Sequence, residues 1–247
     1  MLSGLDAESI TIVVTTALLL GMAKTGVQGA GMLSVPLLAI AFGGKASSGL
    51  MLPMLLMADV LGVWYYHRHA SFKYLKILFP WAALGVIVGS WAGNYIPEDM
   101  FRTIMATIII ASLVVMVWLE LGGTEKIPDT IYFGAIAGFL GGFTSMIGNL
   151  ASTVMVVYFL SMKLPKNNFI GTAAWFFLVV NWFKVPFHVW VWHTITTDSW
   201  ILALQLTPAI IVGAVAGVFL VRKMTETVYR WFIVGMTLVA AVVMMLR

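Results

Sequence analysis

The sequence predicts an all-α polytopic membrane protein of two inverted repeats, each a broken or re-entrant helical hairpin plus three transmembrane helices. Three observations predict this fold: the composition, a series of apolar blocks and an internal repeat. Of the 247 residues, 61% are hydrophobic and 10% are charged, and the mean hydropathy is +1.00. A soluble domain carries about 25% charged residues. The composition therefore predicts a chain that lies in a lipid bilayer, with little left over for an extramembrane catalytic domain.

Six continuous apolar blocks are each long enough to cross the bilayer as one helix. A crossing needs about 20 apolar residues, because the hydrocarbon core is roughly 30 Å thick. The blocks are residues 47–66, 75–95, 101–121, 168–192, 199–221 and 227–246. They predict six simple spans.

Two further blocks, residues 10–43 and 131–161, are too long for one simple span, and small and polar residues interrupt each near its middle. The first interruption has the sequence KTGVQGAG from Lys24 to Gly31, and the second runs from Gly141 to Asn149. Arms of about 13 or 14 residues reach about 20 Å at 1.5 Å per residue, which is less than the bilayer core. If each block is a hairpin, its tip therefore ends inside the membrane.

The two interrupted blocks belong to an internal repeat. Gly29–Val35 aligns with Gly148–Val154, and Thr25 then aligns with Thr144. Further matches are Gly49 with Gly171, Asp59 with Asn181, Gly89–Gly93 with Gly213–Gly217, and Glu98–Arg102 with Glu226–Arg230. The repeat predicts a first membrane unit at 1–122, a cytoplasmic linker at 123–129 and a second membrane unit at 130–247. A hairpin plus three spans is an odd number of crossings, so the second unit would be inverted.

The basic residues favour hairpins over full crossings. If the interrupted blocks crossed, the loops of the two faces would hold seven and five Lys and Arg, whereas hairpins give nine and three. The nine are Arg68, Lys73, Lys76, Lys126, Lys163, Lys166, Arg222, Lys223 and Arg230, and the three are Lys45, Arg102 and Arg247. Cytoplasmic loops carry the excess of basic residues. The termini are therefore expected on the extracytoplasmic side, although composition leaves full spanning open.

Three ionisable residues lie at membrane depth, namely Lys24, Asp59 and Lys184. Such groups are costly unless they are paired or wetted, and they mark functional sites by default. Two lysines against one carboxylate make the centre cationic, which suits an anion. Asp59 is either an ion-pair partner or a proton carrier. The other candidate binding residues are Thr25, Gly26, Gln28, Gly29, Thr144, Ser145, Gly148, Asn149 and Asn181.

Glycines outside the interruptions predict close packing between helices. Gly85, Gly89 and Gly93 repeat every fourth residue, as do Gly213 and Gly217. Small residues at this spacing let two membrane helices approach closely. They could act within one chain or between two, so a homodimer stays open.

Other classes of function find little support in the residues. The chain has no cysteine, and its four histidines are scattered, so no metal centre and no other cofactor are expected. No serine stands in a nucleophile-like Gly-x-Ser-x-Gly context, so we expect no enzyme. The net charge of +4 reports loop orientation and not nucleic-acid binding. The expected partners are a small anionic solute and the lipid bilayer, and an anion channel remains an alternative to a carrier.

Three segments resemble the sulfite exporter TauE/SafE family. They are GMAKTGVQGAGMLSVP at Gly21–Pro36, GFLGGFTSMIG at Gly138–Gly148, and Gly171–Ala173 before a polar membrane helix. The resemblance covers nearly the whole chain, and Asn149 departs from it where the family often has glycine. It implies a permease that moves a sulfur-containing oxyanion, such as sulfite, a sulfonate or sulfoacetate, across a bacterial cytoplasmic membrane. We expect export by alternating access, with another small organic anion, such as a carboxylate, as the second choice.

Overall fold

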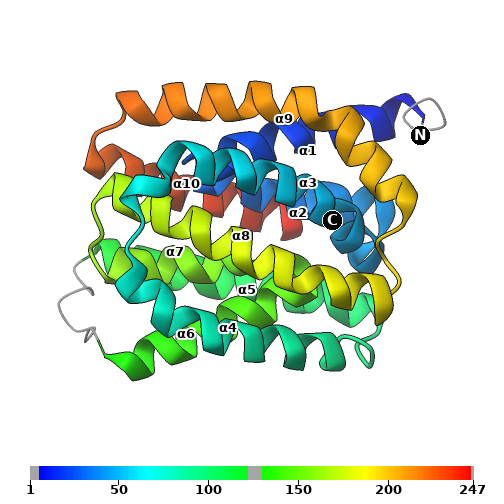
Figure 1. The fold of residues 1–247 in the computed structure, drawn as a ribbon, viewed down its shortest axis with the longest axis horizontal. Coiled ribbons are helices and arrows are strands. Elements are labelled where there is room, and N and C mark those ends of the chain that lie inside the picture. The colour runs from blue at the N-terminus through cyan, green and yellow to red at the C-terminus, as the bar shows by residue number, and fades with distance from the viewer. Residues whose placement is uncertain (1–5, 122–129, 246–247) are drawn as a thin grey trace.

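The computed structural model describes residues 6–121 and 130–245 (Figure 1). Its elements are α1 (Ala7–Lys24), α2 (Gln28–Phe42), α3 (Gly44–Tyr66), the 3-10 turn η2 (His67–His69), α4 (Phe72–Ala92), α5 (Glu98–Glu120), α6 (Ile131–Gly148), α7 (Ala151–Ser161), α8 (Lys166–Trp190), α9 (Thr197–Lys223) and α10 (Glu226–Met245). These described residues contain no strand, so the all-α prediction is confirmed. The predicted linker at 123–129 lies outside the described part of the chain.

Six of the described helices are long and apolar enough to cross a membrane. They cover Ala7–Lys24, Lys45–His69, Phe72–Ala92, Ile131–Gly148, Lys166–Trp190 and Thr197–Lys223. The polytopic membrane class is therefore confirmed. The spans predicted at 101–121 and 227–246 coincide with α5 and α10.

Both interrupted blocks break into two helices that pack against each other, α1 on α2 and α6 on α7. The turns contain Gly26, with φ 125°, and Asn149, with φ 56°. Left-handed backbone is open to glycine and, among other residues, most readily to asparagine. The second break is narrower than the sequence predicted, because only Asn149 and Leu150 separate the two helices.

The two hairpins enter the bundle from opposite ends. In Figure 1, α1 begins and α2 ends at the right of the picture, whereas α6 begins and α7 ends at the left. Their first arms have 18 residues each, which is more than the expected 13 or 14, and α7 has 11. At 1.5 Å per residue, even the longer arms reach only about 27 Å.

The packing of one half reproduces that of the other. Helix α1 packs on α9 as α6 packs on α4, and α2 packs on α10 as α7 packs on α5. Helices α3 and α8 pack on each other, and each also contacts one outer helix of the other half, α3 with α9 and α8 with α4. If each of the helices α1–α5 is matched in order with one of α6–α10, every principal helix contact of one half therefore has a counterpart in the other half.

Glycines make the contacts between the halves close. A Cβ at Gly85 would collide with the carbonyl oxygen of Phe139, and one at Gly213 would collide with that of Leu18. These two glycines lie at matching positions of α4 and α9. The sequence alignment instead matched Gly89 with Gly213, which is one helical turn away. Because the glycines recur every four residues, composition alone leaves that register ambiguous.

Two lysines make equivalent contacts at opposite ends of the bundle. Lys45 Nζ donates to the carbonyl oxygen of Gly93 at 3.2 Å, and Lys166 Nζ donates to that of Val221 at 3.2 Å. Each cation thereby contacts a carbonyl at the C-terminal end of α4 or α9, where a positive charge is favourable. Gly93 was expected to pack against a helix, but its neighbour is the ring of Trp192.

Candidate functional site

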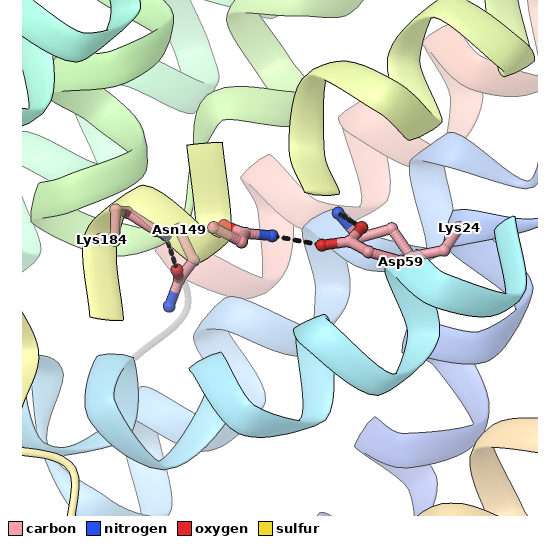
Figure 2. Close-up of polar contacts among 5 residues, drawn as sticks. Lys24, Asp59, Asn149 and Lys184 are labelled. Atoms are coloured by element: carbon pink, nitrogen blue, oxygen red, sulfur yellow. Dashed lines mark hydrogen bonds and ion pairs between the residues drawn. The ribbon is translucent and has the colours of Figure 1, made fainter. Parts of the chain in front are cut away.

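An ion pair joins the first hairpin to the central helices (Figure 2). Lys24 is the last residue of α1, and its Nζ lies 2.9 Å from Oδ1 of Asp59 in α3. The amide of Asn181, in α8, donates to the other oxygen of Asp59 at 2.6 Å. Asp59 is 0% exposed. A buried carboxylate requires such partners, and the structure shows the ion pair that the sequence allowed for Asp59.

Lys184 forms a second polar cluster on α8. Its Nζ donates to Oδ1 of Asn149 at 2.6 Å and to the carbonyl oxygen of Ser145 at 3.0 Å. Figure 2 shows Lys184 and Asn149 side by side, apart from Lys24 and Asp59. No carboxylate in the described chain forms an ion pair with Lys184. When Lys184 is protonated, its positive charge therefore has only neutral oxygens as partners.

Asn149 ties the second hairpin tip to α3. Its amide nitrogen lies 3.2 Å from both the carbonyl oxygen and the hydroxyl oxygen of Ser48. Its backbone N–H donates to the carbonyl of Ser145 at 3.0 Å and so caps α6. Glycine would allow the same left-handed turn but has no side-chain amide. Asn149 thus keeps the turn and adds a group that accepts from Lys184.

The contacts of the glycines align the two hairpins. Gly21 packs on the backbone of α9, and Gly142 packs on the backbone of α4, so these two residues hold matching positions. Three residues later, α1 carries Lys24, whereas α6 carries Ser145. The second hairpin therefore has no lysine at the position of Lys24.

In the central helices, the lysine belongs to the second half instead of the first. A Cβ at Gly62 of α3 would collide with the carbonyl oxygen of Lys24, while Lys184 of α8 donates to the carbonyl of Ser145. Gly62 and Lys184 hold matching positions in the two halves. Each half thus supplies one buried lysine, the first from its hairpin and the second from its central helix.

A small cavity lies between the two hairpin tips. Its volume is about 20 Å³. The lining residues are Leu20, Ala23, Lys24, Gly31, Met51, Leu55, Ser145, Asn149, Ala151, Ser152, Phe177 and Asn181. This space accommodates about one water molecule. An oxyanion with several heavy atoms requires more room, so the structure represents a conformation that is closed around the centre.

The two predicted threonines point away from the cavity. Thr25 donates its hydroxyl hydrogen to a backbone carbonyl, with Gly21 O at 3.0 Å and Ala214 O at 2.9 Å. Thr144 donates to the carbonyl of Leu140 at 2.7 Å. Neither threonine lines the cavity. The glycine contacts also place the two threonines two positions apart, so they are not the equivalent pair that the alignment assumed.

The predicted glycines have mainly structural contacts. The carbonyl oxygen of Gly26 accepts a hydrogen bond from the Tyr229 hydroxyl at 2.7 Å, and Gly148 is buried as the last residue of α6. The side chain of Gln28 and the surroundings of Gly29 lie outside the described residues. Of the residues proposed from sequence, the structure thus gathers Lys24, Ser145, Asn149 and Asn181 at the cavity, with Asp59 and Lys184 bonded to them.

Sequence reasoning missed three residues of the centre. The ring of Phe177 lies 3.9 Å from Lys24 Nζ, Ser152 lines the cavity, and Ser48 contacts Asn149. Phe177 precedes Asn181 by four positions and Lys184 by seven, which places all three on one helix face. That spacing was an available signal for Phe177. Ser152 lies within the repeated segment, but no pattern marks Ser48.

Comparison with known proteins identifies the family of the chain. A family model described as sulfite exporter TauE/SafE matches residues 13–244. No curated protein and no solved structure matches the chain. Because the family match covers nearly the whole chain, the protein belongs to the sulfite exporter TauE/SafE family.

Proposed function

We propose that the protein is a permease for a small sulfur-containing oxyanion, such as sulfite, a sulfonate or sulfoacetate, in the cytoplasmic membrane of a bacterium. The family supports a transporter of sulfur anions and not an enzyme. The observation that carries the proposal is Lys184, which is fully buried in an apolar helix and has no carboxylate partner among the described residues. A charge in that position is costly, and a transported anion would compensate it.

The groups around the cavity suit an oxyanion. An ammonium has three donors and an amide nitrogen has two, so Lys24 and Asn181 each keep a donor beyond the bonds described above, whereas both amide hydrogens of Asn149 are directed at Ser48. Hydrogen bonds from a charged donor to an oxyanion are about twice as strong as neutral ones. The site would therefore bind several oxygens of one anion through donors from the first hairpin and from α8.

We infer that transport occurs by alternating access between two inverted repeats. The matched helix contacts support this inference, as do the equivalent bonds of Lys45 and Lys166 at opposite ends. In inverted-repeat transporters, the substrate lies near the midplane between the repeats while one repeat moves against the other. The central cavity of about 20 Å³ is too small for a sulfur oxyanion, so entry of the substrate would require such a movement.

The orientation of the chain can be tested by labelling. The ends of α3, α7 and α9 lie at the left of Figure 1. All of the nine predicted cations except Lys126, which is outside the described residues, lie at these helix ends or near the starts of the helices that follow them. We expect this end to be cytoplasmic and the termini to be extracytoplasmic. The chain has no cysteine, so a Thr197→Cys or His69→Cys variant has a single thiol. An impermeant maleimide should label Thr197→Cys in intact cells, and His69→Cys only after permeabilisation. The reverse pattern would contradict the orientation.

The proposed activity can be tested with purified protein. Sulfite and methanesulfonate should raise the unfolding temperature, because a ligand at 100 times its Kd stabilises the folded state by about 2.7 kcal/mol.

Proteoliposomes should show saturable sulfite flux with counterflow, and protein-free liposomes should not. An inside-negative potential should favour efflux of a monovalent anion by about 2.3 kcal/mol per 100 mV. Equal stabilisation by acetate would contradict specificity for sulfur oxyanions, and single-channel currents would identify a channel.

A further inference from the structure

Three buried ionisable side chains set the net charge of the centre. Among the described residues, the charged side chains that are buried there are Lys24, Lys184 and Asp59. With both lysines as ammonium ions and Asp59 as carboxylate, the centre carries one net positive charge. One bound monovalent anion would make it neutral.

Asp59 sets this net charge without lining the cavity. It is fully buried, it is absent from the cavity wall, and its partners are the ammonium of Lys24 and the amide of Asn181. Both of these partners line the cavity. An anion in the cavity would therefore share Lys24 and Asn181 with Asp59, so Asp59 acts on binding through these two side chains.

A second negative charge on the ligand would change this balance. A divalent anion would leave one negative charge in excess at membrane depth, where the low dielectric makes uncompensated charge costly. Protonation of Asp59 removes that excess and leaves Lys24 fully available to the ligand. Among the residues that the structure describes, the charged groups acting on Asp59 are Lys24 from α1 and Lys184 from α8. Both are basic, so added negative charge would come from the ligand.

We propose that Asp59 makes the site selective for valence: the protein binds a monovalent sulfur oxyanion without a proton, and a divalent one only together with a proton held by Asp59. This inference rests on the proposed function, because it assumes that the anion occupies the cavity beside Lys24. It assigns the monovalent form as the preferred substrate class. Transport of a divalent anion would then be coupled to transport of one proton.

Methanesulfonate and sulfate form a suitable pair of probes, because they have similar size, differ by one charge and do not titrate near neutral pH. Calorimetric titration in two buffers with different protonation enthalpies counts the protons bound with each anion. We expect no proton with methanesulfonate and about one with sulfate. By linkage, the affinity for sulfate should fall about tenfold for each unit by which the pH rises above the range where Asp59 ionises. The affinity for methanesulfonate should stay constant over the same range.

The Asp59→Asn variant should remove this discrimination. Its centre would carry two positive charges, so sulfate should bind at least tenfold more tightly than to the original protein at pH 8, without proton uptake. Asn181→Ala is the matched control, because it removes a hydrogen bond to Asp59 but leaves the charge. It should retain the difference of one proton between sulfate and methanesulfonate, even if both affinities fall.

The outcomes separate this inference from the proposed function. Absence of binding by sulfite and methanesulfonate would overturn the proposed function. Binding of methanesulfonate together with sulfate binding that takes up no proton would overturn only the role of Asp59. If methanesulfonate binds but sulfate binds neither the original protein nor Asp59→Asn, the role of Asp59 is likewise overturned. If Asp59→Asn fails to fold, the proton count on the original protein still decides the question.

Discussion

Replacement of Lys184 by Met should weaken methanesulfonate binding about 100-fold, since a hydrogen bond to a charged group contributes about 1.5–3 kcal/mol. Lys184 is fully buried and bonds to Asn149 and Ser145 on the second hairpin. Methionine fills a similar volume but removes the charge that has no carboxylate partner. The centre would then be neutral before an anion enters. Calorimetric titration of the purified variant measures the change.

Lys223→Met is the matched control for this prediction. It makes the same substitution at an exposed lysine at the end of α9, outside the central cluster. Charges that are exposed and separated by more than about 10 Å are largely screened in 0.1 M salt. Binding to this variant should change less than twofold. If Lys184→Met binds methanesulfonate as tightly as Lys223→Met does, the anion site does not lie at this centre.

Substitution of Gly142 should be strongly destabilising. A Cβ at this position would collide with the carbonyl oxygen of Ala82, so α4 and α6 would have to separate. Overpacking of this kind costs about 1–3 kcal/mol. We therefore expect Gly142→Ala to lower the free energy of unfolding by about 2 kcal/mol, and Gly142→Leu to prevent stable folding. Thermal unfolding in detergent, followed by circular dichroism, measures the effect.

Gly235→Ala provides the control for helix propensity. Gly235 lies on α10 with no atom within 4 Å of an added Cβ, so alanine should leave stability unchanged or raise it. Gly213→Ala should behave like Gly142→Ala, because Gly213 makes the same kind of backbone contact in the other half, with Leu18 of α1. Equal unfolding temperatures for Gly142→Ala and Gly235→Ala would show that the α4 and α6 contact tolerates separation.

Much of the fold followed from the sequence because a bilayer constrains helix length and backbone hydrogen bonding. Continuous apolar blocks predicted the long helices. The first polar interruption predicted the end of α1, whereas α6 continues through most of the second interruption to Gly148. The left-handed backbone at Gly26 and Asn149 came from the structure, and few other residue types fit it. The register between the halves was less certain, since one apolar residue replaces another at little cost and the glycines repeat every turn.

The candidate site was predictable to the extent that charge is rare in apolar segments. Lys24, Asp59 and Lys184 were identified for that reason, but the sequence could not say which lysine pairs with Asp59. The structure pairs Asp59 with Lys24 and leaves Lys184 to Asn149. These pairings depend on distances between helices far apart in the chain.

What the sequence determined was thus the membrane class, the broken helices and the buried ionisable groups, because each depends on local composition. Only the tertiary structure decided which hydroxyls turn toward backbone carbonyls, as Thr25 does, and which side chains reach the cavity, as Phe177 does. The physical reason is that close glycine contacts set the rotation and depth of each hairpin against the opposite half. Those contacts join residues such as Gly21 and Ile210, which no local pattern connects.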